Sequence, residues 1–515
     1  MFNWITLLKP ERHYNFSRKG MKKSLVSDND FRTEFQKDFD TICNSSSLRR
    51  LQSKAQVFPL EREDFFRTRL THSIEVMSIA ESMGYSLIKV IEKKEKDRKT
   101  RRCIKNIPTI LKSAALIHDL GNPPFGHISE GVISKWFSDN LSKLYFKNNK
   151  LLFDDRAHDN GDDLDHILSD EQKEDFIHFD GNAQSLRIIT HLQNPIKCTG
   201  MNLTYPVMAS IIKYPCNPYT GKNAKGKSPS KKDYFLEEKE IYMDIQNSLE
   251  LNHARYPLVY IIEASDDIAY LTADIEDACR KKLISIEEIY NECKKHISSD
   301  DSNDNSLLNY AIECLDLFTD MLMKSEHKKI LDEHDELIII RQFRAQIKGK
   351  LISEAIKAFE NNYDAIMNGA YNGELLKEKN TISLRNVFCS LLVNKVYYSK
   401  EIVKSKIESC KIMSSLLSNY ILSIFNHDEE ANAKADDEYS LIYNTLSPDF
   451  CNICKKSINK YKEKTRKDNA LSNEEKAKRI RRQTSYYKLL LAVDQISGMT
   501  DTYALDSYHL IKAIS

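Results

Sequence analysis

The sequence predicts an all-α protein with a helical core, an additional helical C-terminal region and few short strands. Only 14 Gly and 12 Pro occur among 515 residues, which is too few for a turn-rich β architecture. Apolar residues also recur at helical spacing in long segments, and this pattern continues from Tyr256 almost to the C-terminus. The length suits one large domain or two to three ordinary ones.

The first strongly predicted helix begins near residue 67. Leu70, Ile74 and Met77 recur there at helical spacing, and His72 is three residues from Glu75 on the same surface. The segment is therefore predicted to be a helix, and His72 and Glu75 are neighbours on it.

The segments that follow alternate between buried and solvated character. The charged run 93–102 is expected to be a solvated linker or helix face. A short, apolar helix from about Pro108 to His118 is expected to be buried. Residues 154–180 are acidic and predicted to be an irregular insertion. Residues 216–234 form a Lys-rich loop, either a linker or a basic lid near an anionic ligand.

Composition excludes several classes of protein. The formal net charge of +1 gives no global attraction to nucleic acid or membrane, so any such binding requires a local patch. No apolar run reaches the ~18 residues of a membrane span, and the N-terminal run is too short for a signal peptide. The 11 cysteines are scattered, and Cys451 and Cys454 lack a second Cys/His pair for zinc. We therefore expect a cytoplasmic protein with reduced thiols and no membrane partner.

Histidines and carboxylates surround the end of the buried helix. His118 and Asp119 stand where the apolar segment stops, and the turn "GNPPFG" leads from them to His127 and Glu130. Because two prolines stiffen this turn, His127 is expected to be held in one place. With His72 on the earlier helix, the two segments offer several groups to one pocket.

A third segment adds carboxylates. Asp266, Tyr270 and Asp274 follow one another at i, i+4 and i+8, which is one helical face. Buried carboxylates are costly unless they are paired or bind a metal. Two imidazoles and two carboxylates suit a divalent ion such as Mn, Fe, Zn or Mg. The spacing alone leaves a structural role and a metal site both open.

His72, His118-Asp119 and Asp266 reproduce the H…HD…D signature of the HD-domain metal phosphohydrolases. Five longer segments, in order from about residue 45 onward, resemble the deoxyguanosinetriphosphate triphosphohydrolase family of that group. They are "RTRLTHSIEV", "HDLGNPPFGHISE", "FDGNAQSLRI", "EASDDIAY" and "ISGMTDTYALD".

The resemblance implies an all-α HD-domain fold and hydrolysis of deoxynucleoside triphosphates, dGTP favoured, at the α-phosphate. The products would be a deoxynucleoside and inorganic triphosphate. It implies a divalent metal, Mn or Mg before Fe, Co or Zn, on His72, His118, Asp119 and Asp266. His127 would be the general acid that protonates the leaving 5′-oxygen, and Glu130 would be its partner.

The resemblance also implies substrate contacts, and each has a structural alternative. The structural alternative for Arg69 is an ion pair with Glu63 or Asp64, and for Tyr214 and Tyr270 it is packing in the core. For Arg344 a substrate contact and a purely structural role are equally supported by the sequence. The implied substrate-binding residues are Gln56, Arg69, Asn182, Lys213, Tyr214, Tyr270, Asp274 and Arg344.

On this basis we divide the chain into three parts. An N-terminal segment (1–44) precedes an HD-domain catalytic core (45–290) that includes the acidic insertion and the Lys-rich loop. A helical C-terminal region (291–515) is expected to complete the fold and to provide an oligomer interface.

Two other functions stay open at this stage. One is another HD phosphohydrolase, a 5′-nucleotidase or a phosphodiesterase. The other is a nucleotide-sensing or single-stranded nucleic-acid-binding regulator on the same fold, suggested by the basic, aromatic run "KAKRIRRQTSYYK". The expected partners are a dNTP substrate, further copies of the chain (a hexamer among the options), and single-stranded DNA or a nucleotide as effector. Base preference is not determined by these motifs.

Overall fold

The structure is a computed structural model that describes residues 1–14, 30–60, 65–154, 162–194, 199–215, 234–299, 304–325, 332–427 and 437–514. In this part of the chain the secondary structure is helical apart from isolated bridges and one hairpin. The hairpin pairs β1 (Leu144–Lys147) with β2 (Lys150–Phe153) in antiparallel register. The predicted all-α class with few short strands is confirmed.

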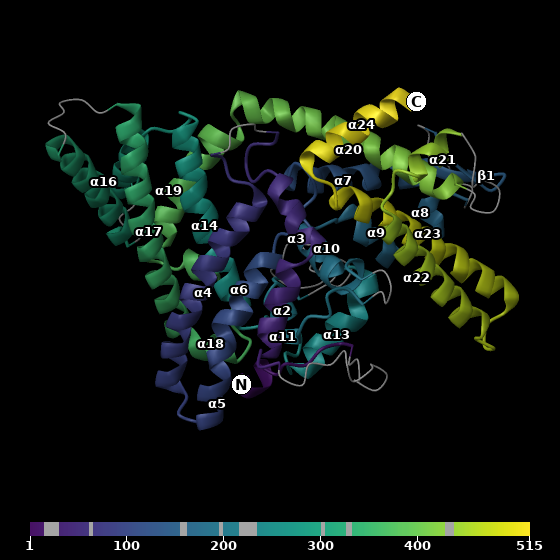
Figure 1. The fold of residues 1–515 in the computed structure, drawn as a ribbon, viewed down its shortest axis with the longest axis horizontal. Coiled ribbons are helices and arrows are strands. Elements are labelled where there is room, and N and C mark those ends of the chain that lie inside the picture. The colour runs from purple at the N-terminus through teal and green to yellow at the C-terminus, as the bar shows by residue number, and fades with distance from the viewer. Residues whose placement is uncertain are drawn as a thin grey trace.

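Three helices form the centre of the molecule (Figure 1). The long helix α4 (Arg69–Lys94) packs along α6 (Ile107–Ile117), and both contact α14 (Val259–Arg280). Both α4 and α6 match the predicted segments. These three helices carry the predicted metal ligands or lead directly into them.

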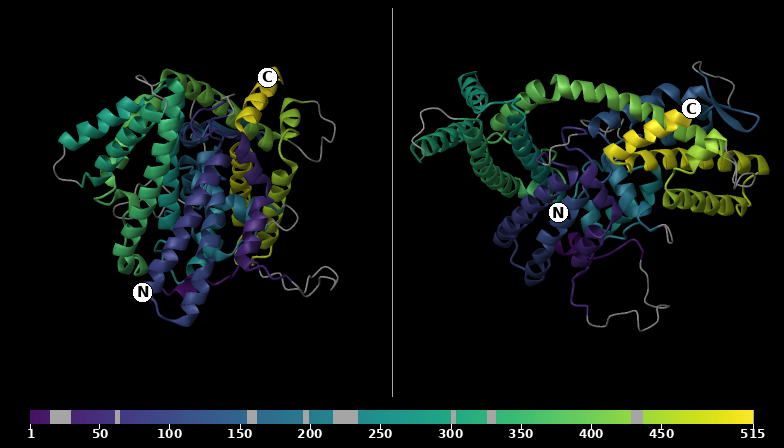
Figure 2. Two further views of the ribbon diagram at one scale, coloured as in Figure 1. Left: turned by 60° about the vertical axis from the view of Figure 1, so that its left-hand side comes forward. Right: turned by 45° about the horizontal axis from the view of Figure 1, so that its top comes forward.

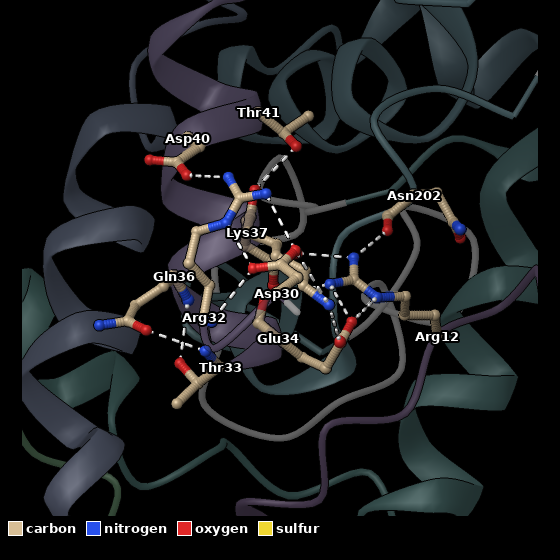
Figure 3. Close-up of polar contacts among 11 residues, drawn as sticks. Arg12, Asp30, Arg32, Thr33, Glu34, Gln36, Lys37, Asp40, Thr41 and Asn202 are labelled. Carbon is tan, nitrogen blue, oxygen red and sulfur yellow. Dashed lines mark hydrogen bonds and ion pairs between the residues drawn. The ribbon is translucent and has the colours of Figure 1, made fainter. Parts of the chain in front are cut away.

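Arg12 pairs with two carboxylates of the N-terminal segment and joins that segment to Asn202 by a hydrogen bond (Figure 3). The guanidinium of Arg12 lies 3.1 Å from Glu34 and 2.6 Å from Asp38, and it also donates to the backbone oxygen of Asn202. The predicted boundary near residue 44 therefore does not separate an unattached segment. The elements here are α1 (Trp4–Leu7), α2 (Glu34–Cys43), α3 (Ser46–Arg50) and the 3₁₀ turn η2 (Leu51–Ser53).

Shorter elements connect the central helices along the chain. They are α5 (Arg98–Cys103), η3 (Ile104–Asn106), α7 (His127–Asn140), η4 (Leu141–Lys143), α8 (Leu164–Ile167), α9 (Asp170–Ile177), α10 (Gly181–Arg187), the π-helical turn η5 (Ile188–Leu192), α11 (Tyr205–Ala209), η6 (Leu236–Glu238) and α13 (Lys239–Ser248).

The segment 154–180 is less irregular than expected. Residues 155–161 lie outside the described part, but α8 and α9 occupy much of the remainder. Helix α9 begins with a capping box in which Ser169 and Gln172 satisfy each other's backbone N–H groups. Its Phe176 is buried. The capping box and the burial of Phe176 therefore stabilise a helix here despite the acidic composition of the segment. Of the Lys-rich loop, residues 216–233 lie outside the description.

The C-terminal half forms two wings joined by one long helix. The first wing contains α15 (Ile286–Ser299), α16 (Ser306–Ser325), α17 (Glu333–Asn361), α18 (Tyr363–Met367), η7 (Leu375–Lys377), α19 (Ile382–Leu391) and the π-helical turn η8 (Leu392–Tyr397). Helix α20 (Lys400–Asn426) then runs across the molecule to the second wing (Figure 2). That wing contains α21 (Glu438–Tyr443), α22 (Pro448–Arg466), α23 (Asn473–Ser497) and α24 (Asp501–Ile514).

No helix in the described ranges is long and apolar enough to span a membrane. The nine cysteines within these ranges are free thiols. The division of the chain at residues 44 and 290 stays a prediction.

Candidate metal centre and substrate cavity

Local sequence fixes where the first histidine points. Thr68 caps α4 and forms a reciprocal capping box with Thr71, so the helix begins at Arg69. His72 then falls on the buried face of α4 and is 1% exposed. Its Nε2 lies 3.1 Å from Asp266 Oδ1 on α14.

The second histidine is held in one tautomer by the backbone. The Nδ1–H of His118 donates to the carbonyl oxygen of Ala115 at 2.6 Å, because a carbonyl can only accept. When the ring is neutral, Nε2 therefore carries the lone pair. This atom is buried without a hydrogen-bond partner, 3.7 Å from Asp119 Oδ1 and 3.6 Å from Asp266 Oδ1. Burial lowers the pKa of His118, but the carboxylates of Asp119 and Asp266 outweigh it and raise that pKa, so without a metal the ring favours its protonated form. A backbone acceptor behind the ring is a common support for a metal-ligating histidine.

These residues fit a divalent metal ion. His72, His118 and Asp119 offer ligand atoms that all lie within 4.8 Å of one another, and Asp266 faces both imidazoles. The His118 nitrogen buried beside these carboxylates favours a positive charge, either a proton or a metal ion in its place. Asp163, Asp165 and His166 form another group of ligand-type residues, but Asp163 is used as the N-cap of α8.

Opposing effects set the ionisation of these groups. Burial raises the pKa of Asp119, but Arg69 and then His118 outweigh it and hold that pKa well below its usual range. Burial likewise disfavours the Asp266 carboxylate, whereas Lys213 and His118 keep its pKa low. Both carboxylates are therefore ionised at neutral pH, as metal ligands must be.

Two cations stand next to these carboxylates. Arg69 is 2% exposed, and its Nη1 donates to Asp119 Oδ2 at 2.6 Å. The alternative ion-pair partners considered for Arg69, Glu63 and Asp64, lie outside the described residues. Lys213 Nζ donates to Asp266 Oδ2 at 3.4 Å. Both cations line the same cavity, so an anion there would meet two positive charges.

The cavity has a volume of about 690 Å³, within the range typical of small-molecule sites. His118 is not among its lining residues and lies behind Asp119 and Asp266. The predicted site residues that line the cavity are Gln56, Arg69, His72, Asp119, Glu130, Asn182, Lys213, Tyr214, Asp266, Tyr270 and Asp274.

Helix α7 brings the predicted catalytic pair to the cavity. His127 is its first residue, and the side chain of His127 lies outside the described part of the structure. Glu130 lines the cavity one turn later. A Cβ added at Gly181 would lie 2.6 Å from Glu130 Oε1, so the glycine of the "FDGNAQ" segment leaves room for this carboxylate.

Arg344 is placed differently from the other predicted contacts. Its guanidinium donates to Glu276 at 2.9 Å and to Glu75 at 2.7 Å, and Arg67 pairs with the same two carboxylates. Arg344 does not line the cavity. The structure thus shows the ion-pair role for Arg344, and a substrate contact stays a prediction.

Sequence reasoning missed the residues that close the cavity from the C-terminal half. Val393 and Tyr397 come from η8, and Ile402 and Lys406 from α20. The Tyr397 hydroxyl donates to Asp274 Oδ2 at 3.1 Å. The only local signal was the aromatic pair in "NKVYYSK", and nothing in a single sequence links that pair to α14.

Tyr270 and Asp274 lie on the face of α14 that lines the cavity. The Tyr270 hydroxyl is 3.9 Å from the sulfur of Cys389 and 3.5 Å from Nη2 of Arg385. Burial raises the pKa of Asp274 to about 7. This wall therefore combines aromatic surface with hydrogen-bonding groups.

A metal-type donor set and two adjoining cations on one cavity are the features that a hydrolase of phosphorylated compounds would require. Comparisons identify the family. The chain is 34% identical to a deoxyguanosinetriphosphate triphosphohydrolase-like protein of Listeria monocytogenes, over 99% of this chain and 100% of that protein. The corresponding Listeria innocua protein gives the same values. A deoxyguanosinetriphosphate triphosphohydrolase of Yersinia enterocolitica is 29% identical over 93% of this chain and 94% of its own. No protein-family model matches.

The chain belongs to the family of deoxyguanosinetriphosphate triphosphohydrolases and triphosphohydrolase-like proteins.

Proposed function

We propose that this protein hydrolyses deoxynucleoside triphosphates, dGTP first among them, to a deoxynucleoside and inorganic triphosphate. The observation that carries the proposal is the convergence of Arg69, Lys213 and the candidate metal ligands on one cavity of about 690 Å³. The relatives named deoxyguanosinetriphosphate triphosphohydrolase support the choice of substrate.

A divalent ion would be held by His72, His118, Asp119 and Asp266. Mn or Mg is favoured, with Fe, Co or Zn as alternatives. When bound, such an ion would polarise the α-phosphoryl oxygen and position the attacking water. The buried Nε2 of His118 and the two ionised carboxylates support this assignment.

The cations of the chain would bind the substrate's charge. Arg69 and Lys213 would contact phosphate oxygens, because each already lies at an anionic group on the cavity wall. Tyr214, Gln56 and Asn182 line the same space and would complete the phosphate and sugar contacts. These contacts would hold the triphosphate in one orientation, which lowers the entropic cost of reaction.

The leaving 5′-oxygen needs a proton, and His127 would supply it. A protonated imidazole is a suitable acid near neutral pH. Glu130, one helical turn away and on the cavity wall, would hold the ring charged and oriented. Tyr270, which lines the same cavity, would lie over the sugar and leave no room for a 2′-hydroxyl.

Product analysis tests this proposal. Purified protein is incubated with each dNTP and NTP plus Mn or Mg, and we expect inorganic triphosphate and the deoxynucleoside. Release of orthophosphate would instead indicate a 5′-nucleotidase, and turnover of a cyclic nucleotide or diester a phosphodiesterase. His127→Ala should bind dGTP but lose most turnover, by ~10²-fold or more. The matched control, His509→Ala, removes an exposed histidine of α24 and should be fully active.

A second function is supported by the charge of the α22–α23 hairpin. Between Lys455 and Lys488 the sequence has 13 Lys and Arg against 4 Asp and Glu. Arg481 stacks on Phe146 and Lys488 on Phe425 beside a cavity of about 650 Å³. We propose that this surface binds single-stranded DNA as an effector, because such proteins combine basic and aromatic side chains.

Salt dependence tests DNA binding. Affinity for a labelled oligodeoxythymidylate should fall steeply as salt rises, and Arg481→Glu should weaken it. Reversal of an exposed charge on the other wing, Lys295→Glu, should not. Equal effects of the two reversals would contradict the proposal. DNA binding without any dNTP turnover would favour the regulator interpretation over the enzyme.

We also propose that copies of the chain associate, with a hexamer as the state to test first. Large apolar side chains are exposed on α16 and α20, namely Leu317, Met321 and Ile407 at 54%, 57% and 67%, and such surfaces often mark interfaces. Sedimentation of the wild type and of Leu317→Lys tests this: a monomeric wild type would contradict it.

A further inference from the structure

The segment "ISGMTDTYALD" contains none of the residues proposed to bind the metal or the substrate. The structure places two of its residues against the loop that follows the candidate metal ligands. Ser497 is the last residue of α23 and Asp501 the first of α24. Both are buried, at 0% and 3% exposure.

Lys54 joins this segment to the loop after α6. Its ammonium nitrogen donates to the carbonyl oxygen of Asn122 at 2.6 Å and to that of Ser497 at 2.7 Å. Lys54 itself is only 2% exposed. A buried lysine is costly unless its donors are satisfied, so these two bonds tie the three segments together.

Asp501 makes a parallel connection. Its Oδ1 accepts the backbone N–H of Phe125 at 2.9 Å, and its Oδ2 accepts that of Ala55 at 3.0 Å. Phe125 and Gly126 have φ of +63° and +72°. Positive φ is unfavourable for a phenylalanine, so this turn requires contacts that hold it, and the Asp501 carboxylate provides one of them.

The loop 119–126 has a candidate metal ligand at one end and the candidate general acid just beyond the other. At one end the Asn122 amide donates to Asp119 Oδ1 at 2.5 Å, while the Asn122 carbonyl is the group that Lys54 holds. At the other end Gly126 is the N-cap of α7, whose first residue is His127. A shift of this loop would therefore move Asp119 and the start of α7 together.

We infer that Lys54 and Asp501 are positioning residues for the reaction. They fix the loop 119–126 so that a metal ligand and the general acid keep their relative placement. Neither side chain lines the cavity, so neither is a catalytic residue. The inference rests on the proposed function for its activity readout, but metal binding tests it independently.

The test compares variants in the full chain. Asp501→Asn keeps the shape but turns an amide NH₂ toward one of the two backbone N–H groups. Lys54→Met keeps the length and removes both donors. The matched control is Asp175→Asn, because Asp175 is as buried (1%) and accepts the Leu236 N–H and the Tyr486 hydroxyl at 2.8 and 2.6 Å. Asp175 does not line the cavity either.

Each variant is assayed at a temperature at which circular dichroism shows it folded. We expect kcat for dGTP to fall ~10- to 100-fold for Asp501→Asn and Lys54→Met, with KM changed by less than about threefold. Mn²⁺ affinity, measured by electron paramagnetic resonance without substrate, should weaken about tenfold or more. Asp175→Asn should change neither quantity.

The inference would be overturned if folded Asp501→Asn and Lys54→Met proteins both kept wild-type kcat and Mn²⁺ affinity. It would also be overturned if Asp175→Asn lost as much kcat and Mn²⁺ affinity as they do. If only one of Asp501→Asn and Lys54→Met folds, the kcat and Mn²⁺ affinity of that variant decide the question. If the wild type hydrolyses no dNTP, the proposed function fails, and the Mn²⁺ comparison still decides whether Lys54 and Asp501 position the ligands.

Discussion

Gly126 offers a sharp test of the loop geometry. It is the N-cap of α7, with φ +72° and ψ −148°, a region that essentially only glycine occupies. A Cβ added here would also lie 2.8 Å from Nη2 of Arg69. Gly126→Ala therefore perturbs the backbone and a buried cation in one change.

The expected cost can be worked from these two contacts. Forcing a side chain into this backbone region costs about 1–3 kcal/mol. Arg69 must also move, although its Nη1 is held 2.6 Å from Asp119, and weakening a charged hydrogen bond adds about 1–2 kcal/mol. A small gain from the stiffer unfolded chain offsets less than about 1 kcal/mol. We expect a net loss of about 2–4 kcal/mol in the free energy of unfolding.

Urea unfolding followed by circular dichroism measures this loss. Gly131→Ala is the matched control, because Gly131 lies inside the same helix and an added Cβ meets nothing within 4 Å. It should be neutral or stabilising by up to about 1 kcal/mol. A Gly126→Ala protein as stable as the Gly131→Ala protein, with normal dGTP turnover, would refute the argued geometry.

Three further predictions concern other parts of the structure. Tyr270→Ala should hydrolyse GTP at a rate much closer to its rate with dGTP, because the wall beside the 2′ position is removed; unchanged rejection of GTP in a competition assay would exclude this role. Arg344→Met should lower the free energy of unfolding by about 1–2 kcal/mol, since Glu75 and Glu276 lose a part-buried partner. Its KM for dGTP should stay within roughly twofold of the wild-type value. A large rise in KM would instead indicate that Arg344 contacts the substrate. Burial lowers the pKa of Lys54 to about 7, well below its unfolded value of ~10.4. Between these values the unfolded chain binds one more proton, so stability should rise with pH by about 1.4 kcal/mol per unit relative to Lys54→Met. Parallel urea titrations from about pH 7.5 to about pH 9 check this slope, and a pH-independent difference would show that the folded lysine stays charged.

Much of the fold and the metal site followed from local pattern. Periodic apolar residues located α4 and α6 to within a few residues, and the buried helix does end at His118-Asp119. The convergence of His72, Asp119 and Asp266 was implied by the family signature, and the structure brings them together.

The remainder depended on contacts between distant segments. Tyr397 reaches Asp274 across 123 positions of sequence, and no periodicity encodes such a meeting. Arg344 lies among carboxylates that became visible only when α4, α14 and α17 were packed. The helices within 162–180 were not predicted, because the acidic composition of this segment was given more weight than the capping box at Ser169.

The connection from Lys54 to Ser497 spans 443 positions, and this has a consequence for biosynthesis. A chain still on the ribosome possesses every candidate metal ligand once residue 266 has emerged, but the contacts that fix Asp119 and the start of α7 come only with residues 497–501. A nascent or prematurely terminated chain would thus hold the ligands without a fixed loop. If Lys54 and Asp501 position the ligands as inferred, such a chain is expected to hydrolyse dNTPs poorly until residues 497–501 are in place.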